Sequence, residues 1–251
     1  MKKLFYLFLI GILFVSIKCR PISSPPDAIP TGGGTLKIHF LPTYEGLPLY
    51  MDKAVKHNGN LPIKFQRLSL FTNLTTGTTT SATQKVSFSS IYDENAAKQG
   101  ITVTLDNFAA GTYEKAQLGI GIDRTTNKKV PSDYKNGDIL AEVADYWDSW
   151  NSYIFTKTEG KFDKDGSGKF ASAFSYHTGT DEMYRVFTLP NTVTITAGKV
   201  TDINVEIDFK KVLNGANGLI NPLKDQNAHS LANKPVGLRI MDNYTTALSV
   251  K

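Results

Sequence analysis

The chain has 251 residues, a formal net charge of +5 and a single cysteine. Hydrophobic residues make up 41% of it, enough for one sizeable core. One cysteine rules out an internal disulfide and a cysteine-cluster metal site. Lysine and arginine are dispersed along the chain and form no basic cluster, so we expect no nucleic-acid partner.

Residues 1–18 are predicted to be a signal peptide. Two lysines precede an apolar run, Leu4 to Ile17, which has the length of a signal-peptide core and is too short to span a membrane comfortably. Cys19 follows at once, as in bacterial lipoproteins, where that cysteine carries the lipid. The Ser-Ile-Lys before it departs from the usual lipoprotein residues, so an ordinary signal peptide with an incidental cysteine is the alternative.

Removal of residues 1–18 takes away three lysines and leaves 25 basic against 23 acidic residues, a net charge of +2. Residues 19–34 then hold the lipidated cysteine and a flexible tether rich in Pro, Ser and Gly. We expect residues 35–251 to form one domain, held by its lipid anchor in the bacterial cell envelope, on the periplasmic side or at the cell surface.

Alternating apolar and polar residues predict an all-β fold, an antiparallel β-sandwich with few short helices. Only Ser90–Lys98 and Asp138–Asp145 are expected to form short helices. The expected strands are Leu36–Leu41, Ile63–Phe71, Lys85–Phe88, Ile101–Leu105, Tyr113–Ile122, Tyr153–Thr158, Phe170–Tyr176, Arg185–Leu189, Thr192–Ile195 and Val200–Phe209.

Both tryptophans, Trp147 and Trp150, open a strand-like run that begins at Tyr153. A turn at residues 163–168 sends the chain back through a second run that ends at Tyr176, with His177 directly after it. Because a hairpin returns its last residues to the place where it began, we expect an indole and an imidazole to meet near one sheet edge.

The turn itself, Asp163-Lys-Asp-Gly-Ser-Gly168, matches the first half of an EF-hand calcium loop, with oxygen side chains at positions 1, 3 and 5 and glycine at position 6. Position 12, which should be a bidentate glutamate, is Phe174, and the flanks read as strands. The simpler interpretation is a hairpin loop that uses Asp and Gly for turn geometry.

Several segments of the sequence follow one another in an order that is typical of one protein family. They are LKIHFLPTYEGLPL, IKFQRLSLFTNL, GTYEKAQLGIGID, WDSWNSYIFTKTEG, FSYHTG and IMDNYTTALSV, and they span roughly Leu36 to Val250. In this order they resemble the MbnP-like copper-binding family of bacterial periplasmic proteins and lipoproteins. The resemblance implies a β-sandwich that binds copper through histidines near an oxidisable tryptophan. It also implies a di-haem peroxidase-like partner in some members.

The sequence departs from this family in three places. The tryptophans are separated by two residues instead of one, Ser152 replaces the glycine before Tyr153, and Pro42 stands where the opening strand often carries a histidine. His39 lies on the other side of Phe40, an odd number of residues away, and is expected on the opposite sheet face. These departures raise the alternative that the metal site is partly lost.

The candidate metal ligands are His177, His229 and His39, and Trp147 and Trp150 are candidates for lining or modification. Neutral imidazole suits copper. Each residue also has a plain structural interpretation: a histidine that only forms hydrogen bonds, or a tryptophan that fills the core. His57 reads as a solvated turn residue, and the three methionines Met51, Met183 and Met241 as packing.

No hydrolase elbow, HExxH zinc motif or phosphate-binding loop is present. We therefore expect a non-enzyme. The function that fits best is an envelope-anchored copper-binding protein, which sequesters or delivers the metal. The alternative is a surface lipoprotein interaction module that keeps the sandwich and has lost the metal site.

Overall fold

The computed structural model describes residues 32–77 and 79–251. The predicted signal peptide, the lipidation site Cys19 and nearly all of the tether lie outside the described residues. None of the helices in the described part is long and apolar enough to cross a membrane.

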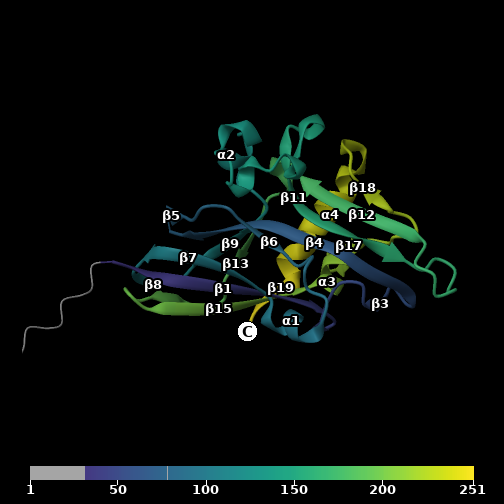
Figure 1. Ribbon diagram of the computed structural model, residues 1–251, viewed down its shortest axis with the longest axis horizontal. Coiled ribbons are helices and arrows are strands. Elements are labelled where there is room, and N and C mark those ends of the chain that lie inside the picture. Colours follow the sequence, from purple (N-terminus) through teal and green to yellow (C-terminus); the bar gives the residue numbers. More distant parts are fainter. Residues whose placement is uncertain (1–31, 78) are drawn as a thin grey trace, which may run out of the picture. The chain divides into compact units, whose positions relative to one another are not determined.

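The first sheet is centred on β1 (Gly33–Tyr44). This strand pairs in parallel with β15 (Val200–Asp208) and antiparallel with β7 (Ile101–Ala109), so the three lie side by side in Figure 1. Two short strands, β2 (Leu47–Pro48) and β19 (Leu248–Val250), extend it. Alternate β1 side chains are buried, as the period of two in this segment predicts.

The second sheet follows the order β13–β9–β4–β11–β12–β18. Its longest strands are β4 (Leu61–Thr76) and β11 (Ser152–Phe162), which pair antiparallel. The other strands on this path are β9 (Gln117–Ile120), β12 (Ser172–Gly179), β13 (Arg185–Thr188) and β18 (Asn227–Ala228). Shorter strands beside β4 and β11 are β3 (Ala54–His57), β5 (Thr79–Thr80), β6 (Gln84–Ser87) and β10 (Tyr146–Trp147).

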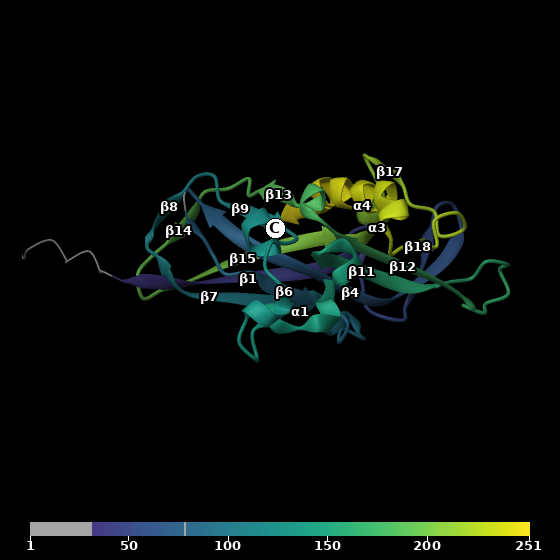
Figure 2. The ribbon, with the colours of Figure 1, turned by 90° about the horizontal axis from the view of Figure 1, so that it is seen from above.

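Two small ribbons and four α-helices complete the described chain. The ribbons pair β8 (Gly111–Tyr113) with β14 (Val193–Ile195), and β16 (Asn214–Gly215) with β17 (Gly218–Leu219). The helices are α1 (Glu94–Gln99), α2 (Arg124–Asn127), α3 (Phe209–Leu213) and α4 (Lys234–Ala247). Figure 2 shows α3 and α4 close together on one side of the sheets and α1 on the other.

Aromatic side chains join the two sheets and α3 in one buried core. The Phe65 ring of β4 lies 6.1 Å from Tyr44 of the first sheet and 6.0 Å from Phe209 of α3, measured between ring centroids. Phe209 in turn meets Tyr244 of α4 at 6.3 Å. Burial of such rings is the main stabilising contribution, because each removes a large apolar area from water.

The all-β class with few short helices is confirmed: 47% of the described residues lie in strands and 21% in helical turns. The expected strands are present, except that Tyr113–Ile122 is divided between β8 and β9, which belong to different sheets, and most pairs are antiparallel. Two pairs are parallel, β1 with β15 and β12 with β18, so the sheets are mixed.

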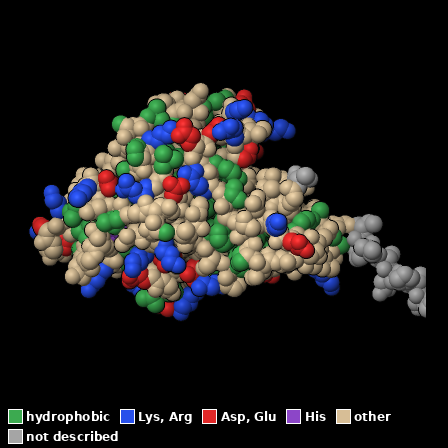
Figure 3. Space-filling model, turned by 180° about the vertical axis from the view of Figure 1, so that it is seen from behind, with side chains coloured by type: hydrophobic (Ala, Val, Ile, Leu, Met, Phe, Trp, Pro, Cys, Tyr) green, Lys and Arg blue, Asp and Glu red, His purple; other side chains and the backbone are tan. Residues whose placement is uncertain are grey.

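On the face shown in Figure 3, basic and acidic side chains are interspersed.

Two local expectations were wrong. Helix α4 was not among the expected helices, and Pro235 at its start fits a helix because its missing N–H needs no partner there. Residues 138–145 form two short 3-10 turns, Ile139–Ala141 and Val143–Asp145, instead of one α-helix.

Candidate metal centre

The β11–β12 hairpin brings the tryptophans and His177 together, as the sequence predicts. Ile154 near the start of β11 lies opposite Gly179 at the end of β12. The Trp147 ring centroid is 5.8 Å from that of His177, with the rings nearly edge to face. An indole and an imidazole from separate strands therefore share one place on the outer face of the second sheet.

His177 belongs to a row of polar side chains on that outer face. It lies directly opposite Lys157, and Glu159 lies opposite both Ser175 and Arg67 on the neighbouring strands. The His177 Nε2 atom is 2.7 Å from the Glu159 carboxylate, and Arg67 donates to the same carboxylate oxygen at 3.2 Å. The carboxylate thus fixes the imidazole and is itself held by a guanidinium.

His229 reaches the same place through a parallel pairing. Asn227 and Ala228 of β18 lie opposite Ser175 and Tyr176 of β12, so the next step in register sets His229 beside His177. The two imidazole centroids are 4.7 Å apart and their planes are almost perpendicular. Two histidines 52 positions apart in sequence are therefore neighbours, which supports the site that the sequence suggested.

Trp147 covers both imidazoles. Its ring centroid is 5.9 Å from that of His229, close to its distance from His177. Trp150 lies against Trp147, with centroids 4.3 Å apart. Both indoles are half-buried and neither belongs to the apolar core, so the interpretation of the tryptophans as core packing is wrong.

A buried ion pair holds the tryptophan-bearing segment on the sheet. The Lys157 ammonium donates to the Asp145 carboxylate at 2.7 Å and to the Ala144 carbonyl at 2.8 Å. Lys85 of β6 pairs with the second oxygen of Asp145. Asp145 is 1% exposed and stands two positions before Trp147, so these bonds set where the indole lies over His177.

Two glycines, Gly160 after Glu159 and Gly179 two positions after His177, stand beside residues of the site. A Cβ on Gly179 would lie 2.6 Å from the Tyr153 carbonyl and 3.0 Å from the Trp150 ring, so only glycine lets the indole pack there. A Cβ on Gly160, next to Glu159, would lie 2.0 Å from the Lys64 carbonyl. Each glycine permits a close approach beside a site residue.

The electrostatics of the cluster favour a neutral His229 and an ionised Glu159. Burial, and then the neighbouring His177, lower the pKa of His229, although Glu159 opposes this shift. The hydrogen bond from His177 and then the charge of Arg67 hold the pKa of Glu159 below its usual range, against the effect of burial. A neutral imidazole can donate a lone pair to a metal ion.

The structure does not bring His39 into this cluster. His39 lies on β1 in the other sheet, where Nδ1 is 2.8 Å from the Thr102 hydroxyl and Nε2 is 2.7 Å from the Asp202 carboxylate. Its odd spacing from Phe40 already placed it on the outer face of that sheet. The expectation that His39 helps His177 is therefore wrong.

His57 is not a solvated turn residue. It is 1% exposed, its Nε2 donates to the Ile220 carbonyl at 2.8 Å, and Nδ1 lies 3.2 Å from the Tyr44 hydroxyl. Burial lowers its pKa. The KHNGN sequence suggested a turn and did not reveal that the imidazole side chain turns inward.

Met51, Met183 and Met241 are all buried in the core, as expected. Within residues 32–77 and 79–251, no three His, Cys, Asp or Glu side chains are placed so that they could together hold a metal ion. A metal at this cluster would therefore take two imidazole nitrogens, and its other ligands would have to be of another kind.

Sequence reasoning gave no role to Glu159, Arg67, Lys157 or Asp145. Glu159 could have been suspected, because it lies in the family segment WDSWNSYIFTKTEG. Its pairing with His177 depends on the register between β11 and β12, which the sequence does not show.

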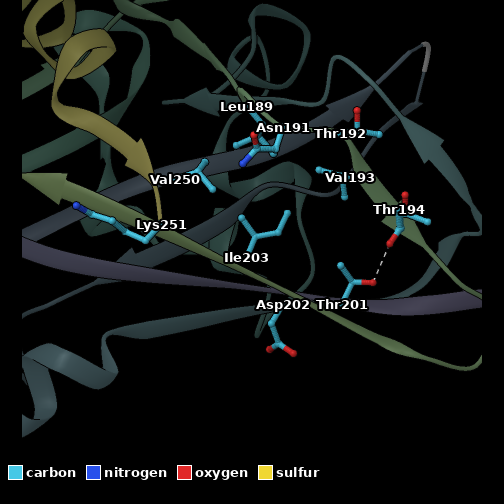
Figure 4. A pocket seen from close by; sticks show the side chains of 10 residues that line it. All are labelled: Leu189, Asn191, Thr192, Val193, Thr194, Thr201, Asp202, Ile203, Val250 and Lys251. Carbon is cyan, nitrogen blue, oxygen red and sulfur yellow. Dashed lines mark hydrogen bonds between the residues drawn. The ribbon is translucent and has the colours of Figure 1, made fainter.

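A separate pocket of about 210 Å³ opens beside β14, β15 and β19 (Figure 4). Leucine, valine, isoleucine and threonine side chains line much of it, and the Thr201 hydroxyl donates to the Thr194 carbonyl at 3.0 Å. No histidine or tryptophan lines this pocket. Asp202 is its one acidic lining residue, and that carboxylate already bonds His39, so the pocket does not compete with the His177 cluster.

The comparisons with known proteins agree with the resemblance. No curated protein matches the chain. Among solved structures, MbnP from Methylosinus trichosporium is similar at 11% sequence identity and a TM-score of 0.43, over 71% of this chain and 76% of that one. The MbnP family model matches residues 33–232, which include β1, the Trp–Glu–Gly hairpin, His177 and His229. The chain therefore belongs to the MbnP family.

Proposed function

We propose that the protein binds one copper ion through His177 and His229 beneath Trp147, and that it sequesters or delivers the metal without catalysis. The observation that carries this proposal is the 4.7 Å separation of the two imidazole centroids under one indole. Membership of the family adds support, because the resemblance implies copper.

The donor set suits copper. Imidazole is a good ligand for copper, and a ligating histidine commonly donates its other ring N–H to a carboxylate, which orients the ring. Glu159 occupies that position on Nε2 of His177, so Nδ1 is the nitrogen left for a metal. Among the described residues, the ring nitrogens of His229 form no hydrogen bond, so both are available.

The cell envelope is the proposed location, with Cys19 as the lipid anchor. A di-haem peroxidase-like partner that oxidises Trp147 is proposed by family resemblance alone, and the half-burial of this indole leaves part of its ring accessible to such a partner. The alternative, an interaction module without metal, keeps the same fold and predicts no copper binding.

The test is a copper titration of the purified protein and of His177→Ala. Loss of a group that hydrogen-bonds a metal ligand typically costs about 10–100-fold in metal affinity, so loss of a ligand itself should cost at least about 100-fold. Glu159→Gln, which keeps the shape but weakens the hold on His177, should fall in the range of about 10–100-fold.

His39→Ala is the matched control, because it removes an imidazole that the structure holds on the other sheet. It should leave copper affinity unchanged. If His177→Ala binds copper as tightly as the unaltered protein, the copper proposal is wrong and the interaction module becomes the better explanation.

A further inference from the structure

The turn between β11 and β12 holds a charged atom without a partner. Asp163 is 3% exposed, and its Oδ1 atom is buried with no hydrogen-bond partner among the described residues. Five other buried side-chain atoms in the described chain also have no hydrogen-bond partner, and all five belong to uncharged groups. An unpaired buried carboxylate oxygen is costly, so a cation is the natural partner for it.

A hydrogen bond within the turn fixes the other oxygen of the same carboxylate. The Gly168 amide donates to Asp163 Oδ2 at 2.8 Å, across the turn, which leaves Oδ1 as the free oxygen of the same carboxylate. The Ser167 amide donates to Asp165 Oδ1 at 3.2 Å. Both bonds hold the carboxylates of the turn in place, and Asp163 Oδ1 is the oxygen left without a partner among the described residues.

The two carboxylates stand two positions apart in the same turn. Carboxylate oxygens at positions 1 and 3 and a hydroxyl at position 5 match the first half of a calcium loop. Gly166 and Gly168, at φ of 74° and 79°, supply the left-handed conformations that this tight turn needs.

We propose that the turn from Asp163 to Gly168 is a calcium site, separate from the copper cluster. Its protein ligands are Asp163 Oδ1, the Asp165 carboxylate and the Ser167 hydroxyl, and water completes the shell. This site lies at the far end of the hairpin, since Phe162 pairs with Ser172 there while Ile154 pairs with Gly179 at the copper end.

The chemistry favours weak binding. Phe174, at position 12, is buried in the core against Phe65, so the bidentate glutamate of a full calcium loop is missing. Lys164 and Lys169 flank the carboxylates and reduce the local negative charge. With few charged ligands, the site belongs with extracellular calcium modules, whose dissociation constants are about 10⁻⁴ to 10⁻³ M.

The test follows hydrogen exchange of the backbone amides in the full chain, freed of metal and then titrated with CaCl₂ to about 10 mM. Calcium should slow exchange in residues 163–170, and MgCl₂ should do so less, because magnesium sheds water reluctantly. Asp165→Asn changes an exposed residue, so the fold should survive. This variant should weaken the effect about tenfold or more.

Glu114→Gln is the matched control, since it removes one exposed carboxylate elsewhere and should leave the calcium response unchanged. His177→Ala should also leave it unchanged, which separates this proposal from the copper proposal. No slowing of exchange at residues 163–170, or equal slowing in Asp165→Asn, would overturn the calcium site.

Discussion

His57 is an imidazole that folding keeps neutral. Its side chain is buried between the Ile220 carbonyl and the Tyr44 hydroxyl, and burial lowers its pKa from the usual value of about 6.5. Above that value, both the folded and the unfolded chain hold a neutral His57. As the pH falls below it, the unfolded chain takes up a proton that the folded chain does not, so stability declines.

We therefore predict that the free energy of unfolding falls as the pH is lowered from 7 to 5, and that His57→Gln flattens this decline. The variant should keep most of its stability at pH 7, because the glutamine amide can still donate to the Ile220 carbonyl. Urea unfolding of both proteins across this range measures the difference. An unchanged slope in the variant would mean that other groups cause the decline.

The end of β12 shows how one strand position controls the cluster of His177 and His229, the proposed copper site. Gly179 lets the Trp150 ring lie against the backbone, and Trp150 supports Trp147, which covers the two imidazoles. An added methyl group would meet the Tyr153 carbonyl, which belongs to the paired strand and cannot move without breaking the sheet. Strand pairing, indole packing and the histidine site are thus linked at this residue.

We predict that Gly179→Ala destabilises the protein by about 1–3 kcal/mol and shifts the tryptophan emission to longer wavelength as Trp150 becomes more exposed. Thermal unfolding and fluorescence are the measurements. Gly111→Ala is the matched control, since its Cβ would meet only Tyr113 at 3.4 Å, an ordinary contact. Equal behaviour of the two variants would show that Trp150 does not depend on this glycine.

The sequence predicts the strands well, because alternation of apolar and polar residues follows directly from burial of one strand face. The same reasoning placed Trp147 beside His177, since the hairpin turn was visible. It missed α4, although Gly237, Ile240, Met241 and Tyr244 are buried at the three- and four-residue spacing of a helix.

The sequence does not show which distant strands pair with each other, or in which register. The parallel pairing of β18 with β12 sets His229 beside His177, and no local pattern specifies which of four histidines will meet. The same holds for His39, which lies on a strand as expected but in the other sheet. The buried His57 was missed because its neighbours, Asn58 and Gly59, are turn residues and the contact with Ile220 spans 163 positions.

The proposed anchor at Cys19 would keep a copper-binding domain at the membrane. Each buried CH₂ of a lipid contributes roughly 0.8 kcal/mol, so several acyl chains on one residue hold a protein firmly. The first strand begins at Gly33, which leaves residues 20–32 between the cysteine and the folded part. The copper cluster lies on the second sheet, whereas the chain enters through β1 of the first. Attachment therefore need not involve the strands that carry His177 and His229.

We predict that a fatty-acid analogue supplied to cells labels the unaltered protein and leaves Cys19→Ala unlabelled, because this cysteine is the only thiol in the chain. The variant should move from the membrane fraction to the soluble fraction and should still bind copper, since the copper ligands lie in the folded part. A gel of labelled protein, fractionation and a copper titration measure the three effects. Equal labelling of both proteins would favour an ordinary signal peptide with an incidental cysteine. Loss of copper binding in the variant would mean that residues before β1 contribute to the metal site.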